Sequence, residues 1–248
     1  MKSFLGKDKA TITVMVQAKT PDRIKELMDK SAPEGAEAFG MQFEQLLQEY
    51  RNADTYKELF SYSDKPTYVT NYRSGKNAGK TDEALAEELL CLAESGATLC
   101  DVMGDYFDMQ PGEFTTNEDA VKKQMELINK LHEKGAEVLM SSHVCKFTPA
   151  EKVLEIALGH QSRGADICKI VTGAGNMEEQ IENLRIINIL KENLKFPFLF
   201  LCGGECHILR RIGGELGCSM YLTVYEYDEL ATPAQPLLKN LKAIRDNM

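Results

Sequence analysis

A lysine stands inside an apolar run that otherwise has the composition of a buried β-strand. The run is "ADICKIVTGAG", and the lysine is Lys169. Burying a lone ammonium group costs several kcal/mol unless other groups compensate. A desolvated lysine also holds its proton less tightly, so its amine becomes a usable nucleophile toward a carbonyl group. The residue types at this position therefore predict imine (Schiff-base) formation with a ketone or aldehyde.

A histidine, His143, ends the preceding apolar run, "VLMSSH". Histidine titrates near neutral pH and can move protons on an imine and on the neighbouring carbon. On adjacent strands of one sheet, His143 and Lys169 would face each other across a site. Asp101, within "TLCDVMG", is a third candidate, either to orient His143 or to cap a backbone amide. Two alternatives stay open: Lys169 in a loop or at a rim, and His143 as a hydrogen-bonded structural residue.

The elements that must position these residues are eight short apolar runs, each followed by a stretch with apolar residues at helical spacing. Strands that alternate with helices predict a parallel sheet. Eight such units predict an α/β chain folded as a single (β/α)8 TIM barrel over residues 1–248, with its active site at the C-terminal ends of the strands. A doubly wound open sheet is the alternative. The expected strands are Thr11–Gln17, Ala36–Gln42, Thr67–Tyr72, Thr98–Gly104, Glu137–His143, Asp166–Thr172, Pro197–Cys202 and Ser219–Tyr225.

The overall charge narrows the class of partner. A net charge of −9 and a pI near 5.1 argue against a nucleic-acid surface or an anionic membrane patch. No apolar run has the length of a membrane span, and the N-terminus lacks a secretory pattern, so we expect a cytoplasmic protein. The expected partner is a small molecule.

Seven scattered cysteines favour reduced thiols over a disulfide framework. The segment "CGGECH" offers Cys202, Cys206 and His207, but this spacing is not a common zinc pattern. The last loop, "EYDELATPAQ", is acidic and lacks glycine, which disfavours a phosphosugar substrate. We expect neither a metal nor a cofactor.

Taken together, these motifs resemble the type I 3-dehydroquinate dehydratase family. The matching segments, in family order over nearly the whole chain, are "YRSGK" with Arg73, "SSHVCKFTP" with His143, "RGADICKI" with Lys169, "RRIGGELG" with Arg211 and "LATPAQP" with Gln235. The resemblance implies a carbon–oxygen lyase of the shikimate pathway and aromatic amino acid biosynthesis. Such an enzyme removes water from 3-dehydroquinate to give 3-dehydroshikimate.

The same resemblance implies a role for each matching residue. Lys169 would form the imine with the substrate ketone, and His143 would act as general base and then as general acid. Arg211 and Gln235 match positions that hold the substrate carboxylate, and Arg73 matches a substrate-contacting arginine. Related barrels pair as homodimers, so a homodimer is expected.

Four positions depart from the family pattern. Gly40 stands in place of a glutamate, Asn77 in place of another, and Ala231 in place of a serine. Gln42 replaces an arginine and keeps its hydrogen-bonding ability, so it is a candidate substrate contact. Because contacts to hydroxyl groups discriminate strongly between substrates, a second hypothesis is a Schiff-base lyase or aldolase-like enzyme for a different hydroxylated keto acid. A third is a non-catalytic binding barrel.

We expect replacement of Lys169 by methionine to abolish activity while leaving stability unchanged or higher, whereas a clear loss of folding would indicate a structural lysine.

Overall fold

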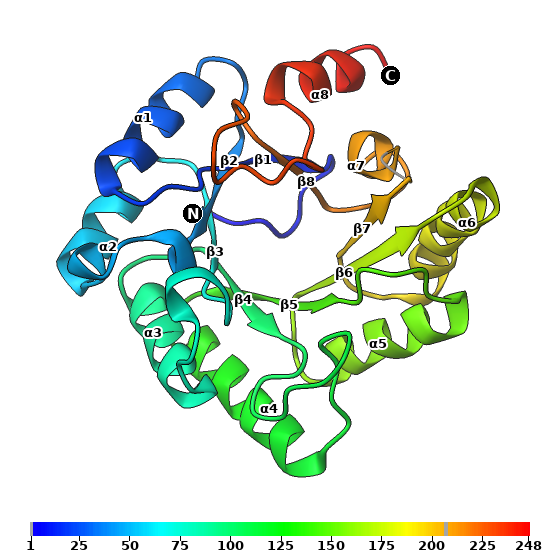
Figure 1. Ribbon diagram of the computed structural model, residues 1–248, viewed down its shortest axis with the longest axis horizontal. Helices are drawn as coiled ribbons and strands as arrows, with labels where there is room; N and C mark the ends of the chain where they lie inside the picture. The colour runs from blue at the N-terminus through cyan, green and yellow to red at the C-terminus, as the bar shows by residue number, and fades with distance from the viewer. Residues whose placement is uncertain (1, 206–207) are drawn as a thin grey trace.

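The structure is a computed structural model that describes residues 2–205 and 208–248. In this part of the chain, eight strands alternate with eight α-helices (Figure 1). Each strand falls at one of the eight predicted apolar runs. The strands are β1 (Thr11–Met15), β2 (Ala38–Gln42), β3 (Thr67–Thr70), β4 (Leu99–Met103), β5 (Glu137–His143), β6 (Ile167–Ala174), β7 (Phe198–Gly204) and β8 (Met220–Thr223).

The strands pair in parallel in the order β7-β6-β5-β4-β3-β2-β1-β8. The last strand therefore lies beside the first. Between β7 and β8, the backbone amide of Ser219 donates to the carbonyl of Phe198 at 2.8 Å, so the sheet is nearly closed. A parallel sheet that follows chain order and returns to its first strand is a (β/α)8 barrel, as predicted. The doubly wound alternative is wrong, because such a sheet reverses its strand order at a switch point.

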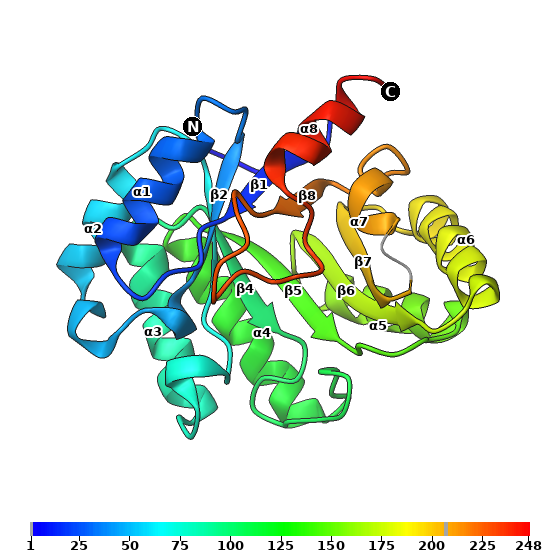
Figure 2. The same ribbon diagram turned by 45° about the horizontal axis from the view of Figure 1, so that its top comes forward.

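The helices surround the barrel (Figures 1 and 2). They are α1 (Pro21–Ser31), α2 (Ala53–Ser61), α3 (Asp82–Glu94), α4 (Glu118–Glu133), α5 (Ala150–Ser162), α6 (Met177–Asn193), α7 (Leu209–Ile212) and α8 (Leu238–Arg245), with 3-10 turns η1 (Phe43–Gln45), η2 (Gln48–Tyr50) and η3 (Gly75–Asn77). Five helices begin after a Thr or Asn whose side chain accepts a hydrogen bond from the first turn, which sets their start points. None of the described helices combines the length and apolar character needed to cross a membrane.

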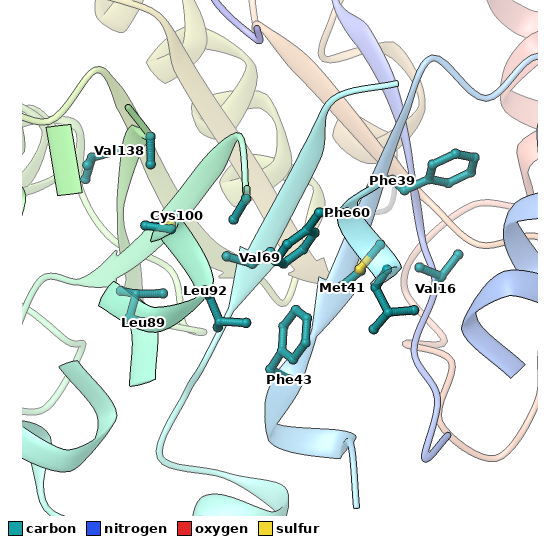
Figure 3. Packing of buried hydrophobic residues seen from close by; sticks show 14 of the residues in the cluster. Val16, Phe39, Met41, Phe43, Phe60, Val69, Leu89, Leu92, Cys100 and Val138 are labelled. Carbon is teal, nitrogen blue, oxygen red and sulfur yellow. The ribbon is translucent and has the colours of Figure 1, made fainter. Parts of the chain in front are cut away.

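Apolar side chains hold the helices onto the sheet. Because successive strand residues face opposite sides, every second residue of β2 packs outward, as Phe39 and Met41 do (Figure 3). Each fully buried side chain of this size stabilises the fold by about 1.5–3 kcal/mol. The same cluster includes Val16, Phe43, Phe60, Val69, Leu89, Leu92, Cys100 and Val138.

The inward-facing residues form layers inside the barrel. The register pairs Leu139 with Ile167, then Ser141 with Lys169, then His143 with Val171. The interior thus changes from apolar at mid-strand to polar toward the C-terminal ends. A register slip of one residue would turn Lys169 out toward the helices, so the packing of β6 is what delivers its ammonium to the barrel interior.

Candidate active site

A cavity of about 210 Å³ lies inside the barrel at the C-terminal ends of the strands. Four of the predicted residues line it: Lys169, His143, Gln42 and Gln235. A larger hollow of about 540 Å³ lies at the opposite end of the barrel, and it contains none of the predicted site residues. The smaller cavity is therefore the candidate site. Its remaining lining consists of Met15, Tyr68, Thr70, Tyr72, Val171, Leu201, Arg210, Leu222 and Thr232.

The Lys169 ammonium is buried, with 4% of the residue exposed. Its Nζ donates to the hydroxyl of Tyr72 at 2.7 Å, to the hydroxyl of Tyr68 at 2.9 Å and to Asp101 Oδ2 at 3.2 Å. These three acceptors use all three donors of the ammonium. These hydrogen bonds offset the free-energy cost of burying the Lys169 ammonium group. Lys169 is therefore neither a loop residue nor a rim residue.

Asp101 is the hub of this cluster and is almost fully buried. Its Oδ2 accepts from the Tyr68 and Tyr72 hydroxyls, and its Oδ1 accepts from Ser141 Oγ at 2.5 Å. Burial, reinforced by the Asp101 charge, raises the pKa of both phenols well above the ordinary value. The phenols are therefore neutral, and each can accept from Lys169 while donating to Asp101.

His143 lies at the end of β5, next to the cavity. Its Nδ1 is 2.6 Å from Glu113 Oε2, and its backbone amide donates to the same oxygen at 3.1 Å. A carboxylate oxygen only accepts, so Nδ1 is the donor, and in the neutral ring Nε2 carries the lone pair. The ring also packs edge-on against Tyr72, with centroids 5.2 Å apart. Glu113, and not Asp101, contacts the ring, whereas Asp101 pairs with Lys169.

Arg73 does not line the cavity. Its guanidinium donates to both carboxylate oxygens of Asp82, at 2.7 Å each, and to Asp105 Oδ1 at 2.7 Å. A further bond reaches the Asp105 carbonyl at 3.0 Å. Two acidic side chains therefore hold the Arg73 guanidinium, and its contact with substrate stays a prediction. Tyr72, the residue before it, enters the site in its place.

Arg210, rather than the predicted Arg211, lines the cavity. Adjacent residues on a helix point about 100° apart, so the two arginines of α7 differ in direction. Arg210 is 8% exposed, and its Nε donates to the Cys202 carbonyl at 2.9 Å. Burial lowers the pKa of its guanidinium. Within the described residues Arg210 has no ion-pair partner, and a buried cation of this kind suits a carboxylate ligand.

Two glutamines supply neutral polar groups. Gln42 Oε1 accepts from Gln17 Nε2 at 2.5 Å, and Gln17 Nε2 also donates to Thr232 Oγ1 at 3.2 Å. Gln235 is 5% exposed, and its Oε1 has no hydrogen-bond partner among the described residues. Leaving a buried amide oxygen unsatisfied costs about 1–3 kcal/mol. A bound molecule that donates a hydrogen bond to Gln235 would recover part of that cost.

The sequence departures have structural counterparts. A Cβ atom added at Gly40 would lie 2.2 Å from Met15 Sδ, so the Met15 side chain occupies the space where a larger residue would start. Asn77 is buried and donates to Asn71 Oδ1 and to the Tyr72 carbonyl, each at 2.8 Å. This side of the cavity is therefore less polar than the family pattern leads one to expect.

The described residues include no group of three or more His, Cys, Asp or Glu side chains that could hold a metal ion. Of the "CGGECH" segment, Cys206 and His207 lie outside the described residues, and Cys202 is buried on β7.

Four site residues were not predicted from the sequence: Tyr68, Tyr72, Glu113 and Arg210. A signal existed for the tyrosines, because strand alternation places Tyr68 and Tyr72 on the same side as each other, on a strand next to that of Asp101. No sequence pattern indicated Glu113 as a site residue, because it lies in the long loop between β4 and α4.

Comparisons with known proteins agree with this geometry. A sequence model of the type I 3-dehydroquinase family matches residues 12–247. The chain belongs to this family. It is similar to a 3-dehydroquinate dehydratase of Alkaliphilus oremlandii, 32% identical over 120 residues, which is 48% of this chain and 47% of the relative. A second, of Lactiplantibacillus plantarum, is 27% identical over 149 residues, 58% of this chain and 57% of the relative. The chain thus spans about half the length of these curated relatives.

Solved structures of the same family share the fold. The 3-dehydroquinate dehydratase of Geobacillus kaustophilus superposes with a TM-score of 0.84 at 14% identity, over 100% of this chain and 95% of that one. The type I enzyme of Clostridium difficile, described with covalently modified comenic acid, gives 0.80 at 18% identity, over 98% and 93%.

Proposed function

We propose that the chain is a lyase that dehydrates 3-dehydroquinate to 3-dehydroshikimate through an imine on Lys169. One observation carries the proposal: within one cavity the barrel brings together a buried lysine, an oriented histidine and a buried arginine that has no carboxylate partner among the described residues. A keto acid with a removable α-proton and a β-hydroxyl group offers a partner to each of the three residues. The lysine reacts with the ketone, the histidine moves the proton, and the arginine binds the carboxylate. Family membership and the curated relatives support the same substrate.

In the first step, Lys169 must give up a proton before its nitrogen can attack the ketone. Asp101 Oδ2, 3.2 Å from Nζ, is the acceptor in direct contact. Attack and loss of water then give an iminium between Nζ and the substrate carbon. The positive nitrogen draws electrons from the neighbouring C–H bond and makes that proton removable.

His143 moves the proton in the second step. Its Nε2 takes the proton next to the iminium carbon, and the ring then returns a proton to the β-hydroxyl, which leaves as water. Water hydrolyses the iminium and regenerates Lys169. The sum is the loss of one water from the substrate, with no oxidation or reduction.

Arg210 and Gln235 hold the substrate carboxylate in this proposal. A guanidinium matches a carboxylate in charge and in geometry. Gln42 and Thr232 also line the cavity, and in this proposal they recognise ring hydroxyls. Arg73 and Arg211 are not among the lining residues, and their contact with substrate stays a prediction.

A second candidate, a Schiff-base lyase for a less hydroxylated keto acid, is favoured by the wall around Gly40. Met15, Leu201 and Leu222 give the cavity an apolar part, and Met15 occupies the space beside Gly40. The expected homodimer and the cytoplasmic location belong to the proposal as well, and size-exclusion chromatography with light scattering tests the first.

A turnover assay tests the function. Purified protein is incubated with 3-dehydroquinate, and the conjugated enone of 3-dehydroshikimate is followed by ultraviolet absorbance. Wild type should produce it and Lys169→Met should not. Turnover by both proteins, or by neither while another keto acid is dehydrated by wild type only, would reject the proposal in this form.

A further inference from the structure

We propose that Glu113, in the loop between β4 and α4, is the positioning residue for His143. It fixes the ring so that Nε2 faces the cavity as a proton acceptor. One carboxylate oxygen, Oε2, contacts both Nδ1 at 2.6 Å and the backbone amide of the same histidine at 3.1 Å. The ring and its own backbone are therefore held by one group. The kinetic consequence rests on the proposed function, whereas the geometry does not.

The loop is shaped to present this carboxylate. Glu113 has a φ of 52°, in the left-handed region that few residues other than glycine adopt, and Gly112 before it has a φ of 82°. The Glu113 amide donates to the Gln110 carbonyl at 3.1 Å. The Glu113 carbonyl accepts from Ser142 Oγ at 2.6 Å. Glu113 thus contacts two consecutive residues of β5, through its main chain and its side chain.

The side chain of Arg163 holds both ends of the loop through hydrogen bonds. Arg163 is 4% exposed and donates to the Gly104 carbonyl at 2.9 Å, to the Thr115 carbonyl and to Gln124 Oε1 at 2.8 Å. Gly104 is required at its position, because a Cβ atom there would lie 2.6 Å from the Glu113 carbonyl oxygen. A buried arginine that directs its donors to the loop's two ends stabilises one loop conformation.

Among the described residues, no other carboxylate contacts the His143 ring. The family's acidic residue after β3 is Asn77 here, and its amide nitrogen donates to Asn71 and to the Tyr72 carbonyl. Asp101 is committed to Lys169. The described residues provide Glu113 as the sole ion-pair partner of His143. In this chain the carboxylate that contacts His143 therefore comes from the loop after β4.

The test compares Glu113→Gln and Glu113→Asp with a matched control, Glu118→Gln, whose side chain is exposed at the start of α4. The first readout needs no substrate. Nitrogen-15 NMR of the imidazole reports which nitrogen of neutral His143 carries the proton, with His143→Gln to assign the signal. The second readout is kcat and KM on 3-dehydroquinate.

We expect wild type and Glu118→Gln to show the Nδ1-protonated tautomer, and Glu113→Gln to shift toward the Nε2-protonated form. We also expect Glu113→Gln to lose about 10- to 100-fold in kcat with KM nearly unchanged, part of the 10²–10⁴-fold that a positioned acid–base group supplies. The kcat of Glu113→Asp should lie between those of wild type and Glu113→Gln, because aspartate keeps the negative charge on a shorter side chain.

An unchanged tautomer in a folded Glu113→Gln protein would overturn the inference, as would an unchanged kcat in an active enzyme. A shifted tautomer in a protein that does not turn over 3-dehydroquinate would support the positioning role and reject the proposed substrate. The two proposals therefore fail separately.

Discussion

The buried pair of Lys169 and Asp101 makes a specific prediction about stability. At the 3.2 Å separation and an effective dielectric constant of about 20, the gross attraction between the two charges is about 5 kcal/mol. Most of it is offset by the desolvation of both groups. Removing one partner is a different matter, because it leaves the other buried and uncompensated, at about 3–5 kcal/mol.

For Lys169→Met we expect a loss of about 2–3 kcal/mol, at the lower end of that range or below it. The reason is that Asp101 keeps hydroxyl donors from Tyr68, Tyr72 and Ser141. In a protein of this size the loss lowers Tm by roughly 5–10 °C. Because Lys169 is paired with Asp101, we now expect the opposite of the sequence-based prediction that methionine leaves stability unchanged or higher.

Urea unfolding of wild type, Lys169→Met, Asp101→Asn and the double variant measures the effect. The double variant buries no charge at this point, and its loss should be at least about 1.5 kcal/mol smaller than the sum of the two single-variant losses, which is the coupling energy of a contacting pair. The midpoint should move while the m-value stays constant. A Lys169→Met protein as stable as wild type, with no coupling to Asp101→Asn, would refute the paired arrangement.

Three further results are expected. Arg210→Met should raise KM about 10- to 100-fold, the value of one charge-assisted hydrogen bond of about 1.5–3 kcal/mol, whereas Arg211→Met should change KM far less; steady-state kinetics decides. Burial raises the pKa of Glu44 to about 7, so its stabilising contribution is complete below about pH 4.5 and is lost as the pH rises through 7. The unfolding free energy of Glu44→Gln should therefore rise relative to that of wild type between pH 5 and pH 8. A difference between the two proteins that does not change with pH would contradict this. Burial, with a contribution from Arg163, lowers the pKa of His160 to about 3, so wild type should lose stability as the pH falls below about 6.5, and His160→Gln should lose less in the same titration.

Much of the fold was predictable from the sequence because local patterns indicate where each strand and helix of the barrel lies. Apolar runs of strand length alternate with helical spacing, and each observed strand falls within or against one of the predicted runs. The position of Lys169 followed from the same logic, since a charge inside such a run faces either the interior or the helices. His143 followed because it ends the neighbouring strand.

The site contacts that were not predicted from the sequence have a common physical cause. Each depends on contacts between segments that are distant in sequence. Arg73 matches a family motif, but Asp82 and Asp105 hold its guanidinium away from the cavity. The rotation of α7 decides between Arg210 and its neighbour.

Glu113 reaches His143 through a loop whose conformation depends on Ser142 and Arg163. Periodicity carries no information about such a loop.

Trapping the covalent intermediate tests the central claim most directly. The protein is incubated with 3-dehydroquinate and sodium borohydride, which reduces an imine to a stable amine, and the intact chain and its peptides are weighed by mass spectrometry. The account predicts one substrate-derived adduct per chain, on the peptide containing Lys169, and none in Lys169→Met. A folded wild-type protein that turns over substrate without forming this adduct, or that carries it on another lysine, would contradict the account.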